Sequence, residues 1–452
     1  MNKKQPFDFA ECADEIKEIG RIDPAFYRKF NVKRGLRNED GSGVLVGLTK
    51  IGDVHGYIVD EGEIVPVEGE LRYRGIEIKN LVQGFQSENR FGFEETVHLL
   101  LMGKLPTASE LEATTARIGE RRGLPESFTK QMILEAPSDN IMNKLARTVL
   151  ALYSYDENPE DYSIQNVLRQ SLDLIARFPV LVSYGFQAKQ HYYGKQSLFI
   201  HTPDPEDSTA ECILKLIRAD SSYTSLEAEV LDLMLVLHAE HSGGNNSAFS
   251  IHVVSSADTD TYSAVSAAVG SLKGTKHGGA NIKVQQMMED IKNNVSDWED
   301  EDEVADYIER IINKEAFDRT GLVYGMGHAV YTLSDPRAVL LKDRVEAMAR
   351  EKGFAEEYEL HEKVGRLTPE VFRRLKSSEK VISPNVDFYS GFVYKMLNIP
   401  EDLFTPLFAV ARIAGWSAHR IEEMINGGRI IRPAYKHIRD EELSYIPLSE
   451  RG

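Results

Sequence analysis

The stretch LEAEVLDLMLVLHAEHSGGNNSAF, residues 226–249, joins a long apolar pattern to a polar segment rich in histidine and glycine. Its apolar residues recur at the spacing of one helix face, which predicts a helix over about 226–240. The residues on this face are Leu226, Val230, Leu233, Met234 and Leu237. Gly243 and Gly244 follow as an ordinary helix-ending signal. The segment therefore places His238 and His241 at the end of a buried helix.

The composition limits the functions that the 452-residue chain can have. It is 42% hydrophobic and 27% charged, which is typical of a globular protein. Its only cysteines, Cys12 and Cys212, form no CxxC pair, so we expect no disulfide framework, no cysteine zinc site and a reducing, cytoplasmic setting. The net charge of −18 repels nucleic acid and anionic membranes. An anionic substrate would therefore need a local cluster of Arg, Lys and His.

The pattern along the rest of the chain is mainly helical. Residues 1–37 are expected to form a helical arm, and 41–78 contain β-branched residues broken by Gly and Pro that predict two to four short strands. We expect a polar connection over 187–208, an acidic turn or helix N-cap over 296–303, and no membrane-spanning or leader segment. The further helices are predicted at 141–153, 164–184, 258–272, 335–350, 387–397 and 403–426.

Four segments combine His, Arg or Asp with glycine. They are HAEHSGGNN (238–246), GTKHGGAN (274–281), YGMGHAVYTLSDPR (324–337) and SPNVDFYSG (383–391). Taken singly, each has a structural interpretation. His238 and His241 could cap a helix end, or bind a metal together with Glu240, although the spacing is not HExxH. His277 lies in a glycine-flanked turn, and Asp387 follows a Pro-Asn turn in a typical N-cap position.

Two arginines are harder to explain as structural residues. Arg412 lies within the apolar stretch 407–416, where a guanidinium needs an anionic partner. Arg337 lies nine residues after His328, near a predicted helix start, and could bind a carboxylate in bidentate fashion. Arg432, in the C-terminal tail, is on its own typical of surface charge.

The order of these motifs resembles the citrate synthase family. The resemblance rests on HAEHSGGNNSAF, GTKHGGAN, YGMGHAVYTLSDPR, SPNVDFYSG, ARIAGW and IIRP, in that order, together with RYRGIEI at 72–78. It extends from about Val44 to Pro433. It implies a mainly α, two-domain citrate-synthase-like helical fold with a few short N-terminal strands. The implied reaction condenses acetyl-CoA with oxaloacetate and hydrolyses the thioester to citrate and CoA.

The resemblance also implies a role for each matching residue. His277 is similar to the histidine that hydrogen-bonds the thioester oxygen, His328 to the one that polarises the oxaloacetate carbonyl, and Asp387 to the base that removes a methyl proton. The residues expected to bind oxaloacetate are His241, Arg337, Arg412 and Arg432, the last reaching the site of a partner subunit. The residues expected to bind CoA are Lys380, Val323, Gly325 and Gly327. No metal and no cofactor are implied, since acetyl-CoA is a substrate.

The site draws on distant parts of the chain, so two lobes must converge on it. We expect a large domain of 1–282 plus 389–452, which includes the β region 41–78, and a small domain of 283–388 that closes over oxaloacetate. The expected assembly is a homodimer. Three alternatives are a 2-methylcitrate synthase that uses propionyl-CoA, a metal-dependent lyase or hydrolase built on His238, Glu240 and His241, and a non-catalytic helical assembly protein.

Overall fold

The computed structural model describes residues 9–38, 41–60, 63–328, 330–376, 381–438 and 444–451. The chain divides into two units, Met1–Leu48 and Thr49–Gly452, which are described separately. The first unit contains α1 (Phe9–Ile19), α2 (Pro24–Lys29) and a short 3-10 helix, η1 (Arg34–Leu36). Asp23 caps α2 by accepting a hydrogen bond from the backbone N–H of Ala25. The helical arm predicted here is confirmed for the described residues.

The second unit begins with one antiparallel sheet of order β1-β2-β3. Its strands are β1 (Gly52–Asp60), β2 (Glu63–Tyr73) and β3 (Ile76–Glu77), and Gly52 pairs with Tyr73. Arg74 and Gly75, both at positive φ, form the two-residue turn between β2 and β3. The small β region is therefore confirmed, with two strands longer than the sequence pattern indicated.

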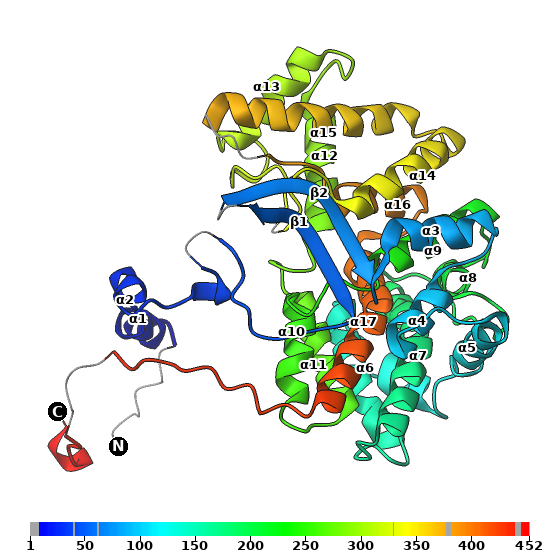
Figure 1. Ribbon diagram of the computed structural model, residues 1–452, viewed down its shortest axis with the longest axis horizontal. Coiled ribbons are helices and arrows are strands. Elements are labelled where there is room, and N and C mark those ends of the chain that lie inside the picture. The colour runs from blue at the N-terminus through cyan, green and yellow to red at the C-terminus, as the bar shows by residue number, and fades with distance from the viewer. Residues whose placement is uncertain are drawn as a thin grey trace. The chain divides into compact units, whose positions relative to one another are not determined.

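Most helices of the second unit form one group around the long helices α7 (Ile164–Tyr192) and α17 (Phe404–Asn426), which pack against each other. Figure 1 shows this group below the β1–β2 hairpin. Its other helices are α3 (Ile78–Ser87), α4 (Phe93–Met102), α5 (Ala108–Glu120), α6 (Ile141–Leu152), α8 (Thr209–Ile217), α9 (Ser225–His238), α10 (Asn246–Ser255) and α11 (Thr261–Lys273). Short helical segments lie at Thr129–Leu134 (η2, a π-helix), Tyr153–Tyr155 (η3), Glu401–Leu403 (η4) and Leu448–Glu450 (η5).

A second group of helices packs together above the hairpin in Figure 1. In it α12 packs against α16, α13 against α15, and α14 against both α15 and α16. The bounds are α12 (Ala280–Asn294), α13 (Glu301–Ile312), α14 (Pro336–Lys352), α15 (Ala355–Lys376) and α16 (Val386–Met396). Helix α14 also contacts α9 and α3 of the lower group and strand β2 of the hairpin. The predicted domain bounds 283 and 388 fall inside helices α12 and α16. They stay a prediction.

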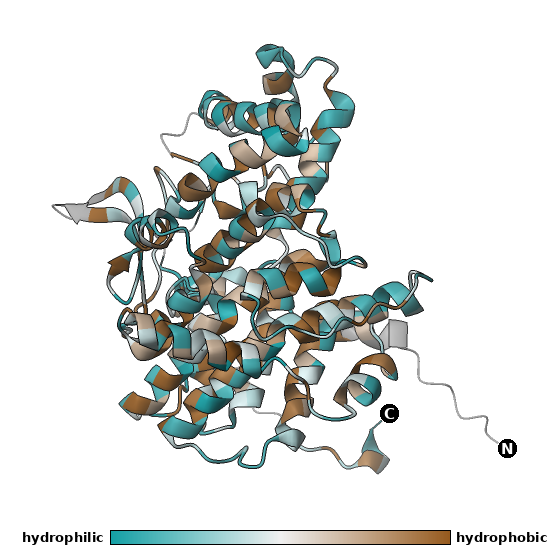
Figure 2. Ribbon diagram, turned by 90° about the vertical axis from the view of Figure 1, so that its right-hand side faces the viewer, coloured by the Kyte–Doolittle hydropathy of each residue, from teal (hydrophilic) through white to brown (hydrophobic). Residues whose placement is uncertain are grey.

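Capping and amphipathic patterning explain why these segments are helical. Capping boxes begin α5, α8 and α9, and Asp300 caps α13, which places the acidic segment 296–303 at a helix start as expected. Most helices carry one hydrophobic and one hydrophilic face, visible as brown and teal in Figure 2. Within the described ranges, no helix has both the length and the apolar character needed to cross a bilayer.

Several predicted helix ends differ from the structure, and α11 begins at Thr261 instead of at Asp258. Helix α9 ends at His238, not at Glu240; at this end the hydroxyl of Tyr73 lies 3.0 to 3.3 Å from the carbonyl oxygens of Val236, Leu237 and Glu240 and donates to one of them. Helix α7 continues to Tyr192, so the first six residues of the predicted connection 187–208 are helical. The amide of Gln187 donates to two carbonyl groups at the end of α8, which allows a buried polar residue in that turn.

Candidate active site

Three rings from two separate segments lie against one another at the candidate site. The ring centroid of His241, just after α9, lies 5.1 Å from that of His328 and 5.7 Å from that of Tyr331. Burial and the nearby Arg337 guanidinium lower the pKa of His241 well below its ordinary value. Its Nε2 is buried and has no hydrogen-bond partner among the described residues. At neutral pH His241 is therefore an uncharged imidazole with one ring nitrogen left for a ligand.

The hydrogen bonds of His328 fix its tautomer. Its Nδ1 accepts from the backbone N–H groups of Val330 at 3.1 Å and Tyr331 at 3.2 Å. A nitrogen that accepts two hydrogen bonds carries no proton, so the proton of the neutral ring is on Nε2. His328 thus presents an N–H donor on the side of the ring away from its own backbone.

The loop before His328 is joined to the segment before Asp387. Gly325 and Gly327 adopt φ of 77° and 82°, which favour glycine. The N–H of Gly327 donates to the carbonyl of Ser383 at 2.8 Å, and the N–H of Asn385 donates to the carbonyl of Gly325 at 2.9 Å. The Asn385 amide also donates to the carbonyl of Gly327. Two of the four sequence segments therefore form one backbone unit.

Asp387 is not the N-cap of α16. Asn385 is the cap, and its side-chain oxygen accepts from the backbone N–H of Asp387 at 2.9 Å. The Asp387 carboxyl is therefore not used for capping. Burial raises its pKa to about 6, although Arg337 and Arg412 each favour the ionised form. A carboxyl with this pKa is ionised at neutral pH and basic enough to accept a proton.

Arg337 is fixed by one buried carboxylate. Its Nε and one Nη donate to the two oxygens of Asp335 at 3.0 and 2.8 Å, and both residues are almost fully buried. Asp335 also caps α14 and accepts from the backbone N–H of Val386. Burial is the largest influence and raises the pKa of Asp335, but the charge and hydrogen bonds of Arg337, together with His328, lower it by more, so the net shift is downward. The ion pair thus connects α14 to the start of α16.

The buried Arg412 contacts a carbonyl group and an aromatic ring instead of an anionic side chain, and Glu240 acts on it only electrostatically. Its Nε donates to the carbonyl of His238 at 2.5 Å, and its guanidinium lies 4.5 Å from the ring centroid of Phe408. Burial lowers its pKa to about 10 while Glu240 opposes the change, so it remains a cation at neutral pH. Arg412 therefore adds a second positive charge near Asp387.

His277 enters the site from the turn between α11 and α12. Its Nε2 lies 2.9 Å from the hydroxyl of Ser247, at the start of α10. Burial, followed by the charge of Arg412, lowers the pKa of His277 to about 4. The hydrogen-bond partner of this neutral ring is thus a serine hydroxyl from another helix.

The remaining predicted site residues include one that is exposed, one that is partly buried and one outside the described residues. Arg432 is exposed in the segment after α17, and Val323 packs against the hydrophobic core. Lys380 lies outside the described residues. The expected roles of these residues, and those of Gly325 and Gly327 toward CoA, stay predictions.

The metal set proposed from the sequence does not assemble. The Nδ1 of His238 pairs with the carbonyl of Met234, and Glu240 pairs with His419 of α17 at 2.8 Å. Burial and the Arg337 charge lower the pKa of His238 to about 3. His238 and Glu240 thus have separate partners, and the group of three potential metal ligands that lies within 4.8 Å among the described residues includes none of His238, Glu240 and His241.

Sequence reasoning missed three residues that shape the site: Asp335, Tyr331 and Tyr73. Asp335 was visible only as a helix start before Pro336, and nothing local shows that its carboxylate also binds Arg337 and Val386. Tyr331 stacks on His328 with ring centroids 4.7 Å apart. Tyr73 reaches α9 from β2 across more than 160 residues of sequence, which no periodicity reveals.

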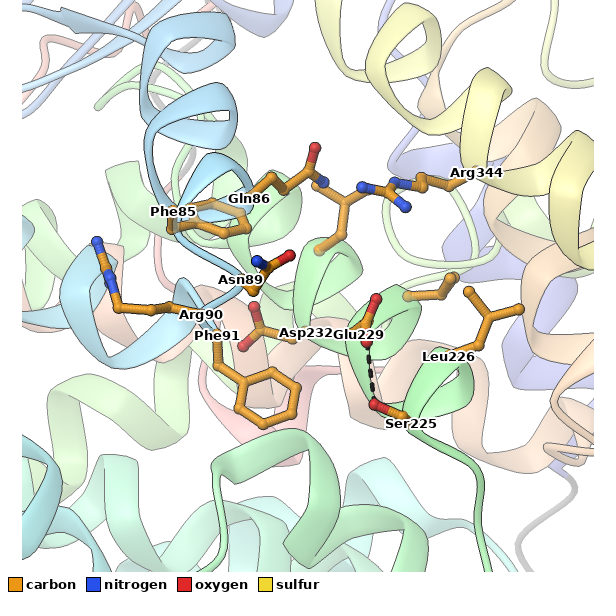
Figure 3. A pocket seen from close by; sticks show the side chains of 12 residues that line it. Phe85, Gln86, Asn89, Arg90, Phe91, Ser225, Leu226, Glu229, Asp232 and Arg344 are labelled. Carbon is orange, nitrogen blue, oxygen red and sulfur yellow. Dashed lines mark hydrogen bonds between the residues drawn. The ribbon is translucent and has the colours of Figure 1, made fainter.

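A cavity of about 250 Å³ lies away from this site (Figure 3). The first half of α9 lines it, together with α3, the segment 89–91 and Arg344, whereas the site adjoins the opposite end of α9. Ser225 donates to Glu229 at its edge, as the dashed line shows. None of the predicted site residues lines this cavity, so we give it no part in the chemistry.

The comparisons with known proteins agree with this fold. A family model described as citrate synthase, C-terminal domain, matches residues 41–434. Citrate synthases from Synechocystis and Haloferax volcanii are each 34% identical, covering 85% and 93% of this chain and 89% and 99% of their own. A 2-methylcitrate synthase from Shewanella oneidensis is 30% identical over 84% of this chain and 92% of its own. The crystal structure of citrate synthase from Pyrobaculum aerophilum superposes with a TM-score of 0.73 at 28% identity, covering 91% of this chain and 94% of that one.

Fold, site and relatives together define a mainly α-helical acyl-transferring enzyme. The chain belongs to the citrate synthase family. The alternatives of a histidine-based metal lyase or hydrolase and of a non-catalytic assembly protein are therefore set aside.

Proposed function

We propose that this enzyme condenses the acetyl group of acetyl-CoA with oxaloacetate, and then hydrolyses the thioester to release citrate and CoA. The observation that supports it best is the setting of Asp387, a carboxyl with a pKa of about 6 beside two buried guanidinium groups. Neutral imidazoles from three other segments complete the set. This combination suits removal of a carbon-bound proton next to a dianionic substrate.

The first step needs a base and an oxygen stabiliser together. A thioester methyl is a very weak acid, so a carboxylate removes its proton only if the developing enolate oxygen is stabilised at the same time. In our proposal Asp387 takes the proton and His277 donates a hydrogen bond to the thioester oxygen. The low pKa of His277 supports this role, because the ring is neutral at physiological pH and can donate its one N–H to the thioester oxygen.

The second step forms the carbon–carbon bond. The enol carbon attacks the ketone of oxaloacetate, whose oxygen becomes an alkoxide and needs a donor. The Nε2–H of His328 is the proposed donor, supported by the two backbone N–H groups that occupy its Nδ1. Arg337 and Arg412 would bind the two carboxylates of oxaloacetate, with His241 beside them. Their positive charges would offset, at the site, the protein's net charge of −18. Water and the two substrates balance the reaction, so we propose no cofactor.

We further propose that residues 283–388 form a lobe that closes after oxaloacetate binds. Supporting this, Arg337 and His328 belong to the upper helix group whereas Arg412 and His241 belong to the lower one, so a dianion that contacts both would draw the groups together. Closure would then complete the CoA site near Val323, Gly325, Gly327 and Lys380. Calorimetric titration tests this: acetyl-CoA binding that is equally tight with and without an oxaloacetate analogue would contradict closure.

A homodimer in which Arg432 serves the neighbouring subunit is also part of the proposal. Arg432 is exposed, and Ile430 and Tyr435 in the same segment are 62% and 96% exposed, which suits a segment that packs on another subunit. Mixing inactive Arg432→Gln with inactive Asp387→Asn subunits tests it. In a heterodimer one site would then be intact, so about a quarter of the wild-type activity should return after random reassociation. If Arg432 acted in its own subunit, no activity would return.

The decisive test of the reaction is CoA release from acetyl-CoA with and without oxaloacetate. We expect release that depends on oxaloacetate, and its complete absence with the fold intact in Asp387→Asn. Oxaloacetate-independent release, or full activity of the variant, would contradict the proposal. Measuring kcat/KM with propionyl-CoA in the same assay compares the 2-methylcitrate reaction directly, since one methylene is worth about 1–3 kcal/mol in a pocket. We also propose a cytoplasmic location, which the buried free thiol of Cys212 supports.

A further inference from the structure

Helices α10 and α17 meet in a line of ionisable side chains that the proposed reaction does not use. The Nδ1 of His252 lies 2.7 Å from a carboxylate oxygen of Glu423, and its Nε2 lies 3.2 Å from the Nδ1 of His419. The Nε2 of His419 lies 2.8 Å from Glu240, which is fully buried. Two imidazoles therefore face each other between two carboxylates.

The protons of this line can be assigned from its ends. An ionised carboxylate only accepts hydrogen bonds, so Glu423 takes the Nδ1–H of His252 and Glu240 takes the Nε2–H of His419. When both imidazoles are neutral, each carries one proton, so both nitrogens that face each other 3.2 Å apart present a lone pair. This contact then needs a cation, either a proton that makes one ring an imidazolium or a metal ion between the rings.

Glu422 brings a third ligand atom to the same point. Its Oε1 accepts from the backbone N–H of Lys50 at 2.7 Å, which turns Oε2 toward the histidines, 3.9 Å from the Nδ1 of His419. The Glu422 side chain is only 10% exposed, and its Oε2 has no hydrogen-bond partner among the described residues. A buried carboxylate oxygen without a donor is costly, and it points to a missing positive partner.

The two arginines that act electrostatically on this cluster donate their hydrogen bonds to backbone carbonyls outside it. Arg74 and Arg412 interact electrostatically with Glu240, and Arg74 also with Glu422. However, Arg74 donates through Nε and one Nη to the carbonyl of Leu100, and Arg412 donates to that of His238. Among the described residues, neither guanidinium group donates a hydrogen bond to His252 or His419.

We propose that His252, His419 and Glu422 bind one divalent transition-metal ion of the zinc type, with water as a fourth ligand. The three ligand atoms already lie within 4.8 Å of one another. Two imidazole nitrogens on a tetrahedral zinc ion, at bonds of about 2.0–2.1 Å, are about 3.3 Å apart, close to the 3.2 Å seen here. To reach a similar spacing of about 3.3 Å, the Glu422 oxygen would need to approach His419 by about 0.6 Å, from 3.9 Å, and His252 by up to about 1.5 Å, from at most 4.8 Å.

The outer contacts of the cluster match those of metal-binding histidines. Such histidines donate their second ring N–H to a carboxylate or carbonyl, and both rings do so here, to Glu423 and Glu240. Gly243 leaves the space beside the nitrogens open, because a Cβ there would lie 3.3 Å from the Nε2 of His252. The metal would tie α10 to α17 and fix Glu240, the neighbour of His241 in the sequence, so we assign it a structural role.

Metal binding by the full-length enzyme tests the proposal without any activity measurement. The protein is stripped with a chelator, dialysed and titrated with Zn²⁺ by calorimetry, and separately with Co²⁺ while visible absorption is recorded. We expect one equivalent of each metal to bind and Co²⁺ to give the intense bands of a tetrahedral site. His252→Gln and Glu422→Gln should weaken binding about 100-fold or more, and Glu423→Gln about 10–100-fold.

His55→Gln is the matched control, because His55 also pairs with a carboxylate but lies exposed in β1. It should bind both metals like the wild type. If one variant fails to fold, the other two still test the site. The proposal would be overturned if the protein bound no metal with a stoichiometry of one, or if the three cluster variants bound the metal as the wild type does. The cation between His252 and His419 would then be a shared proton. Neither result depends on the proposed condensation reaction.

Discussion

Asp335→Asn is the substitution with the most informative expected outcome. The two oxygens of Asp335 accept four hydrogen bonds: from the backbone N–H, Nε and one Nη of Arg337, and from the N–H of Val386. All four partners are donors. Either orientation of an asparagine amide therefore places its NH₂ group against donors and leaves the Arg337 guanidinium buried without its counter-ion.

The expected loss of stability follows from these contacts. Removing one partner of a buried ion pair costs about 3–5 kcal/mol, because the remaining charge is left uncompensated. One charge-assisted hydrogen bond, worth about 1.5–3 kcal/mol, and one backbone hydrogen bond of about 1 kcal/mol add up to a similar figure. We therefore expect the free energy of unfolding to fall by about 4 kcal/mol and the thermal midpoint by about 4 °C, the shift that an unfolding entropy of about 2.1 cal/mol/K per residue gives for this chain length.

The same substitution should change the pH dependence of the enzyme. Burial raises the pKa of Asp387 and the Arg337 charge opposes it, while the Asp335 charge raises it further. Without that negative charge, and with Arg337 freed to attract Asp387, the pKa of Asp387 should fall. The acid limb of kcat/KM for the condensation would then move to lower pH.

Calorimetric melting and a kcat/KM profile between pH 5 and 8 measure both effects. Asp343→Asn is the control, since Asp343 is exposed on the same helix. It should leave the midpoint and the acid limb where the wild type has them. If Asp335→Asn melts like the control, or if its acid limb stays in place, the reasoning from this ion pair is wrong.

Three further outcomes follow from single contacts. In the wild type, kcat/KM should fall about tenfold per pH unit below about pH 6, as protonation removes the Asp387 base; a profile flat down to pH 5 would exclude that residue. Gly325→Ala should lower both activity and melting temperature, because φ is 77° and a Cβ would lie 2.9 Å from a backbone atom of α16. Burial raises the pKa of Glu227, but Arg218 and Lys352 lower it by more, from 4.5 to about 2. The ion pairs of Glu227 therefore stabilise the fold fully above about pH 4.5, and this contribution is lost as the pH falls toward about 2. Lys352→Met should thus cost about 1–2 kcal/mol in urea unfolding at pH 7 and progressively less below pH 4.5, and an equal cost at pH 7 and pH 2.5 would contradict this.

Local chemistry was enough to predict much of the fold. The Asp335-Pro336 pair predicted the start of α14, and the helices near 226–240 and 403–426 are present with ends shifted by a few residues. Capping residues and apolar periodicity act within one or two turns, so a sequence displays them directly. Boundaries shifted near tertiary contacts, as at the end of α9, where the Tyr73 hydroxyl lies 3.0 Å from the carbonyl oxygen of Val236.

The candidate site was only partly predictable. Asp387 and His328 were found through ordered motifs, and the structure joins their two segments by backbone hydrogen bonds. The pairing of Glu240 with His419 joins residues 179 positions apart, and Ser247 reaches His277 across 30. Such partners depend on how helices cross, which composition and spacing do not encode.

The antiparallel bridge between Met326 and Pro384 has a consequence for how the molecule can move. Since Gly327 and Asn385 are hydrogen-bonded across it, no hinge can lie between the loop and the start of α16 without breaking those bonds. Any local opening that admits solvent would move the two bridged segments together as one rigid unit. Amide hydrogen exchange at these two positions should therefore be slow and should accelerate together, in one step, as denaturant is added.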